Sequence, residues 1–165
     1  MKFDMSGAAI ALLLVDTLSK LNVKKNISCV IPVTDNMIDA SAQLPETILT
    51  SMSGKTVEVV NTDAEGRLIL ADAITYAAKK LNSSLIIDLA TLTGTVIYAL
   101  GKYTGAWSSK DQNWTILEKA AKNQNELIWR MPLNDIFLNS LYKNTHADIL
   151  SCSDTDKPDS NIAAA

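Results

Sequence analysis

The sequence predicts a three-layer α/β fold, in which a mostly parallel sheet carries helices on both faces. Three observations predict it. The 165 residues are 47% apolar and 20% charged, which suits one domain, or part of one, and is too few for two. Short β-branched runs alternate with helical patterns four times along the chain. One run, residues 26–33 (NISCVIPV), is apolar enough for an interior strand buried on both faces.

The first helix is predicted over residues 6–21, where apolar residues recur at nearly every position until Ser19 and Lys20. We therefore expect this helix to be mostly buried. Residues 53–55 (SGK) are typical of a tight turn, and the β-branched residues within 56–60 predict a strand after it.

An amphipathic helix is predicted over residues 68–81, with two lysines near its negative C-terminal end. The later elements are predicted as a strand at 84–89, a helix at 91–100, a helix at 114–123, a strand at 127–131, a helix at 136–142 and the first turn of a helix at 161–165.

Composition excludes several classes of partner. The net charge of −3 provides no basic surface for nucleic acid or an anionic membrane. The longest apolar stretch, residues 8–15, is far shorter than the roughly 20 residues that cross a bilayer. The N-terminus lacks the pattern of a secretory signal. The two cysteines, Cys29 and Cys152, have no metal-site spacing and are expected to be free thiols, so we expect a cytoplasmic protein.

Two carboxylates, Asp63 and Glu65, follow the strand predicted at 56–60 and precede Gly66 and Arg67. In extended backbone, residues two apart project to the same side, so these acids are expected to converge on one cation. The carboxyl end of a parallel strand is also where ligands bind in open α/β sheets. The pattern therefore makes both acids candidate metal ligands.

The same residues also fit a purely structural role. Thr62 and Glu65 match the capping box that precedes an apolar helix, and a bare TDAE string favours capping over metal binding. His146, the one histidine, has no acidic or thiol cluster around it and is expected to be structural or exposed.

A longer string favours the metal. Residues 61–73 (NTDAEGRLILADA) are very similar to the signature of the leucyl (cytosol) aminopeptidase family. Four further stretches resemble the same family in the same order: residues 1–9 (MKFDMSGAA), 53–58 (SGKTVE), 88–94 (DLATLTG) and 130–133 (RMPL). The resemblance covers nearly the whole chain.

The resemblance implies an exopeptidase that uses two divalent metal ions, manganese, zinc or cobalt, to remove N-terminal residues, preferentially leucine, from peptides. It implies that Asp4, Asp63 and Glu65 are metal ligands, with Glu65 bridging and Asp63 also binding through its main-chain carbonyl. It further implies that Arg67 holds a bicarbonate that acts as the general base, since a guanidinium offers a fork to a planar oxyanion.

By the same resemblance, Met1, Thr91, Leu92 and Gly94 would contact the peptide substrate. Taken alone, these residues favour plainer roles. Thr91 suits a helix N-cap, Leu92 and Met1 suit core packing, and Gly94 suits close packing of a helix start.

The sequence also departs from the family. Its members carry an upstream segment of the type G-K-G-x-T-F-D-x-G-G, which supplies a lysine and an aspartate to the metals, a second lysine for the substrate carbonyl, and an N-terminal regulatory domain. These 165 residues contain none of them, and the loop before Asn161 lacks the expected glycines. We therefore expect an incomplete catalytic domain with three of five protein ligands and impaired activity. The alternative is an inactive structural paralogue or fragment that packs into an oligomer, which is a hexamer in the family.

Overall fold

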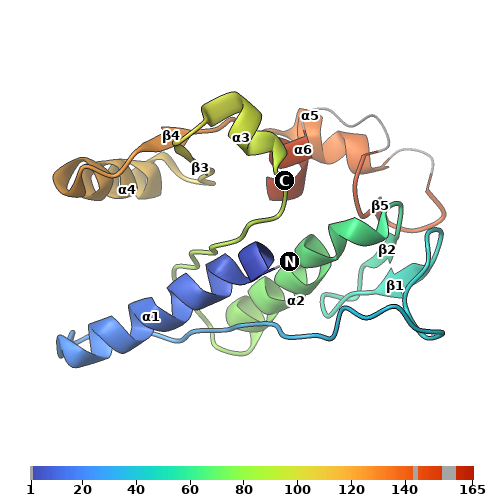
Figure 1. Cartoon of the computed structure of the whole chain (residues 1–165), viewed down its shortest axis with the longest axis horizontal. Coiled ribbons are helices and arrows are strands. Elements are labelled where there is room, and N and C mark those ends of the chain that lie inside the picture. The colour runs from blue at the N-terminus through green and yellow to red at the C-terminus, as the bar shows by residue number, and fades with distance from the viewer. Residues whose placement is uncertain (1, 143–144, 154–158) are drawn as a thin grey trace.

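The computed structural model describes residues 2–142, 145–153 and 159–165. Figure 1 shows the chain from its blue N-terminus to its red C-terminus. Its elements in order are the 3-10 turn η1 (Lys2–Met5), α1 (Ser6–Lys20), β1 (Ile48–Thr50), β2 (Thr56–Glu58), η2 (Thr62–Ala64), α2 (Glu65–Lys79), α3 (Thr95–Leu100), β3 (Thr104–Ala106), α4 (Asp111–Gln124), β4 (Ile128–Arg130), α5 (Asp135–Asn139), η3 (Ser140–Tyr142), β5 (Ile149–Leu150) and α6 (Asp159–Ala164).

The α/β class is confirmed, and two of the three strand pairings within the described residues are parallel. In the first sheet, β2 lies between β1 and β5, antiparallel to β1 and parallel to β5. The second sheet is the parallel pair β3 and β4. In the described ranges the strands therefore form two small sheets instead of the single sheet that the alternation of elements predicts.

Two predicted strands are wrong as local structure. Residues 26–33 and 84–89 carry neither helix nor strand. A strand exists only through hydrogen bonds to a neighbour, and neither segment has a strand partner among the residues described. Their β-branched composition is real, but it cannot produce a ladder without a second backbone.

The predicted helices are confirmed in place, with boundaries shifted by a few residues. The helix predicted from residue 68 begins at Glu65, the one predicted from 114 begins at Asp111, and the one predicted from 91 begins at Thr95. The short strands β1, β3 and β5 were not predicted, because pieces of two or three residues leave almost no periodic signal.

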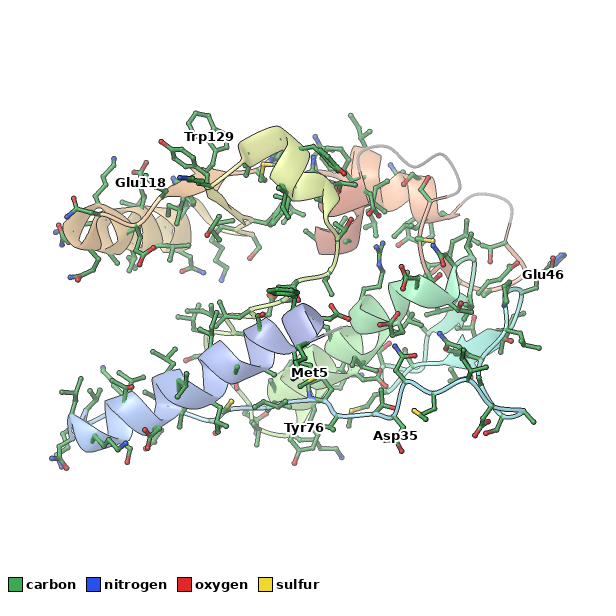
Figure 2. All side chains as sticks on the ribbon, in the orientation of Figure 1. Met5, Asp35, Glu46, Tyr76, Glu118 and Trp129 are labelled. Atoms are coloured by element: carbon green, nitrogen blue, oxygen red, sulfur yellow. The ribbon has the colours of Figure 1, made fainter. Side chains whose placement is uncertain are left out.

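The expectation that the first helix is buried is wrong. Gly7 is the one buried residue of α1, and Leu12 and Leu13 are 61% and 64% exposed. Figure 2 shows side chains extending from α1 into the surrounding space along most of its length. The total accessible surface is 12246 Å², against roughly 8,000 Å² for a compact monomer of this mass. The fold is therefore open.

A small buried hydrophobic cluster lies away from α1, where η3, β5 and α6 come together. Leu141, Leu150 and Ile162 pack together, with Phe137 and Ile149 partly buried against them. The cluster joins the successive elements η3, β5 and α6, and Val60, which directly precedes the 61–73 segment, packs against it. It thus positions the start of α2 relative to α6.

Two smaller expectations concern thiols and membranes. Both cysteines are free, with Cys29 exposed and Cys152 buried. Among the described residues, no helix combines the length and the apolar character that crossing a membrane requires.

Candidate active site

The segment between β2 and α2 is a tight helical turn. Asn61 has extended backbone (φ −130°, ψ 124°), and its side chain accepts a hydrogen bond of 2.9 Å from the backbone N–H of Asp63. A 3-10 turn follows, and Glu65 is the first residue of α2. Asp63 and Glu65 are therefore presented by a helix start, so the extended-strand reasoning about their directions was wrong.

The capping-box alternative is also wrong. The N-cap of α2 is Ala64, which makes no side-chain capping hydrogen bond. Asn61, rather than Thr62, caps the turn. Since Glu65 is not engaged in a cap, its carboxylate remains available to a ligand.

Most predicted site residues line one cavity of about 570 Å³. The candidate metal ligands Asp4, Asp63 and Glu65 line it together with Arg67, although they come from η1, η2 and α2. The full lining is Asp4, Asn36, Asn61, Asp63, Ala64, Glu65, Gly66, Arg67, Thr91, Leu92, Thr93, Gly94, Cys152, Ser153 and Asp159. Met1 lies outside the described residues.

Asp4 reaches the cavity because α1 packs closely on the chain before Thr91. A Cβ built on Gly7 would lie 1.9 Å from the backbone oxygen of Leu89, so only glycine fits at this crossing. The Thr91 hydroxyl lies 3.2 Å from the Phe3 carbonyl and 3.4 Å from Asp4 Oδ1. Because α3 starts four residues later, at Thr95, Thr91 is not its N-cap, and that plainer role is wrong.

Glu65 and Arg67 carry buried polar atoms without partners. Asn36 Nδ2 lies 3.5 Å from Glu65 Oε1, whereas Glu65 Oε2 is buried with no hydrogen-bond partner within the described part of the chain. The Arg67 side chain is 12% exposed, and its Nε and Nη1 are likewise buried and unpartnered. Leaving such groups unsatisfied costs about 1–3 kcal/mol each, so they are the atoms that a bound ion would satisfy.

The carboxylates fit a divalent cation in chemistry but do not complete a coordination sphere. Oxygen ligands of this kind suit manganese or zinc. Across the ranges 2–142, 145–153 and 159–165, however, no three His, Cys, Asp or Glu residues come together as a metal-holding group. The three acids thus share a cavity without converging as closely as the pattern predicted.

One charged residue of the cavity was missed. Asp159, the first residue of α6, forms an ion pair with Arg67, with Oδ1 3.2 Å from Nη2. The two residues are 92 positions apart, so no spacing rule connects them. One signal in the sequence could have indicated Asp159. It is an acid shortly before an apolar segment, in the loop before Asn161 that lacks the glycines expected from the family.

Two further carboxylates hold β2 against the chain that leads into β5. Glu58 accepts hydrogen bonds from the backbone N–H of His146 and the hydroxyl of Thr145, and these bonds lower the pKa of Glu58. Asp148 accepts from the backbone N–H and hydroxyl of Thr56, which lowers the pKa of Asp148. His146 is exposed, as expected.

Comparison with known proteins gives a consistent result. A family model described as "Cytosol aminopeptidase family, catalytic domain" matches residues 1–165. The "Probable cytosol aminopeptidase" of Metamycoplasma salivarium is 47% identical over 165 residues, a match that covers 99% of this chain and 32% of that protein. The protein of the same name from Bacillus subtilis (strain 168) is 47% identical over 136 residues, covering 82% and 27%.

A solved structure agrees. A point mutant of tomato leucine aminopeptidase superposes with a TM-score of 0.87 at 37% identity, covering 99% of this chain and 32% of that one. The chain thus spans about a third of the length of the relatives it matches.

Proposed function

Because the chain belongs to the cytosol aminopeptidase family, we propose that it carries part of a two-metal site that releases N-terminal residues, preferentially leucine, from peptides in the cytoplasm. The observation that supports this most is the single cavity shared by Asp4, Asp63, Glu65 and Arg67, four residues drawn from three separate elements.

In the proposed site, Asp4, Asp63 and Glu65 hold the cations. Two bound divalent ions, manganese or zinc, would polarise the scissile carbonyl and lower the pKa of the attacking water. Glu65 is the proposed bridging ligand. Its buried Oε2 supports that role, because this oxygen has no hydrogen-bond partner among the described residues. Asp63 is proposed to bind through its main-chain carbonyl as well.

Arg67 is the proposed catalytic residue. Its proposed role is to hold the anion that accepts a proton from the attacking water. The family resemblance implies that this anion is bicarbonate. The two buried nitrogens of Arg67 that lack partners support the role, because a guanidinium binds an oxyanion through such N–H groups.

Peptide is proposed to lie along Thr91, Leu92 and Gly94, with Met1 near the pocket for the first side chain. Leu92 packs beside the start of α2, since its Cδ2 would lie 3.1 Å from a Cβ on Gly66. At Gly94 there is open space, with no atom within 4 Å of an added Cβ. The apolar side chain of Leu92 suits contact with an apolar side chain of the peptide, and the open space at Gly94 lets the peptide backbone approach closely.

Hydrolysis of leucine amide in the presence of manganese tests the proposal on the purified chain. We expect slow turnover that falls at least tenfold in Glu65→Gln and is unchanged in Asp111→Asn, which removes an equal charge outside the cavity. No turnover at high manganese would reject activity in this chain by itself.

A structural role in an oligomer is the second candidate. The apolar side chains exposed along α1 favour it, because contiguous apolar surface of this kind marks an interface. We propose a homo-oligomer, a hexamer by family resemblance, and sedimentation velocity tests it. A purely monomeric chain would reject this role.

A further inference from the structure

The ion pair between Arg67 and Asp159 changes how the cavity can bind anions. Oδ1 of Asp159 lies 3.2 Å from Nη2 of Arg67, and the two side chains are 27% and 12% exposed. Both residues line the cavity that holds the candidate metal ligands. The carboxylate of Asp159 therefore pairs with the guanidinium of Arg67 inside the proposed site.

Resting on the proposed function, we propose that Asp159 is the resident anion of this site. Its carboxylate occupies one N–H group, at Nη2, of the guanidinium to which the family resemblance assigns bicarbonate, and so competes with bicarbonate for Arg67. Carboxylate and bicarbonate oxygens are the same kind of acceptor for a guanidinium, and Asp159 contacts Arg67 through one of them, Oδ1.

Charge in the cavity supports the assignment. Among the residues that the structure describes, four carboxylates line it, those of Asp4, Asp63, Glu65 and Asp159, with one guanidinium, that of Arg67, which gives a formal balance of −3. A free anion that enters must compete with Asp159 for Arg67 and must also approach the other three acids. Nearby like charges disfavour such binding even at an effective dielectric constant of about 20.

The anchoring of α6 supports it independently. Asn161, two residues after Asp159, accepts a 2.9 Å hydrogen bond from the indole N–H of Trp107 and is 6% exposed. Ile162 is 3% exposed and belongs to the buried cluster. Asp159 is therefore held in place by its own helix, and an attached anion loses far less translational freedom than a free one.

The direct test is bicarbonate binding to the whole chain, measured by the line width of 13C-labelled bicarbonate in NMR without added metal. We expect Asp159→Asn and Asp159→Ala to bind bicarbonate at least tenfold more tightly than the unmodified chain. Asp111→Asn, which breaks an equivalent arginine pair outside the cavity, should bind like the unmodified chain. Adding Arg67→Gln to either Asp159 variant should abolish the gain.

Two outcomes would overturn the inference: bicarbonate binding to the unmodified chain as tight as to the variants, or no gain in either folded variant, with folding checked by circular dichroism. A second readout is the bicarbonate dependence of leucine amide hydrolysis, which should appear only when Asp159 is replaced. If no protein hydrolyses the amide, the proposed function fails while the binding result still decides the role of Asp159.

Discussion

Two parts of the chain carry similar β-branched sequence and behave in opposite ways. In and after β2, Val57 and Val59 are 7% and 0% exposed, because β1 and β5 pair on either side of the strand. In the segments 26–33 and 84–89, Val33 is 88% exposed and Ile87 is 72% exposed, with no strand partner in the described ranges. Composition therefore sets the preference for a strand, and a neighbouring backbone decides whether it forms.

The candidate site joins these two parts. Asp63 comes from η2, and Glu65 and Arg67 come from the first turn of α2. Asp159 comes from α6, the helix whose Ile162 belongs to the buried cluster. Asp4 comes instead from η1, the 3-10 turn directly before the exposed helix α1. The close approach of Gly7 to the backbone of Leu89 joins α1 to the segment 84–89 and thereby holds Asp4 at the cavity. Substitutions near β2 and the buried cluster should therefore lower stability more than substitutions of exposed side chains in the segments 26–33 and 84–89.

The largest expected effect is a loss of stability in the buried cluster. Ile162→Ala should lower the free energy of unfolding by about 2–5 kcal/mol, because it opens a cavity between α6, η3 and β5. Ile87→Ala should change it by no more than about 0.5 kcal/mol, since that side chain already faces solvent. Urea denaturation measures both, and equal losses would remove the distinction between the two parts.

The next effect sharpens the link between them. Gly7→Ala should destabilise the chain by about 1–3 kcal/mol, because the new Cβ meets the backbone of Leu89 and forces α1 away. Gly94→Ala, where nothing lies within 4 Å, serves as the matched control for stability and should have little effect. Thermal unfolding of both variants is the measurement. A Gly7 variant as stable as the control would mean that α1 is not held there.

A smaller effect is expected where α6 meets the β3–β4 pair. Trp107→Phe removes the indole donor and leaves the buried Asn161 amide without its 2.9 Å partner. Losing one such hydrogen bond should lower the free energy of unfolding by about 1–2 kcal/mol. Trp129→Phe, at a site 58% exposed, is the control, and similar losses in urea denaturation would argue against the anchoring of α6.

The smallest effect is a dependence on pH. Hydrogen bonds from residues 145–146 and from Thr56 lower the pKa values of Glu58 and Asp148 in the folded chain. A lowered pKa means that these carboxylates stabilise the fold above the ordinary carboxyl pKa of about 4, and that this stability is lost as pH falls through the lowered values. The protection of the backbone N–H groups of Thr56 and His146 against exchange, measured by NMR relative to the intrinsic rate at each pH, should fall over that acidic range. Glu58→Gln should remove the response at His146 and leave Thr56 unaffected.

Several features of the fold and site followed from local sequence. The longer helices were predicted because apolar periodicity over ten or more residues is a strong signal. The 61–73 segment made Asp63, Glu65 and Arg67 candidate site residues, and all three line one cavity. The exposure of α1 could not be predicted, since periodicity shows an apolar face but not whether another element covers it. The pairing of Asp159 with Arg67 and the contact of Gly7 with Leu89 depend on tertiary packing between distant residues. No local pattern encodes either contact.

The most direct test of a cation site in the shared cavity is a calorimetric titration of manganese into the folded chain. We expect saturable binding to the unmodified chain, weakened at least tenfold by Asp63→Asn and by Glu65→Gln and unchanged by Asp111→Asn. A titration with no saturable binding, or one that the two cavity substitutions leave unaltered, would contradict the assignment of these acids as metal ligands.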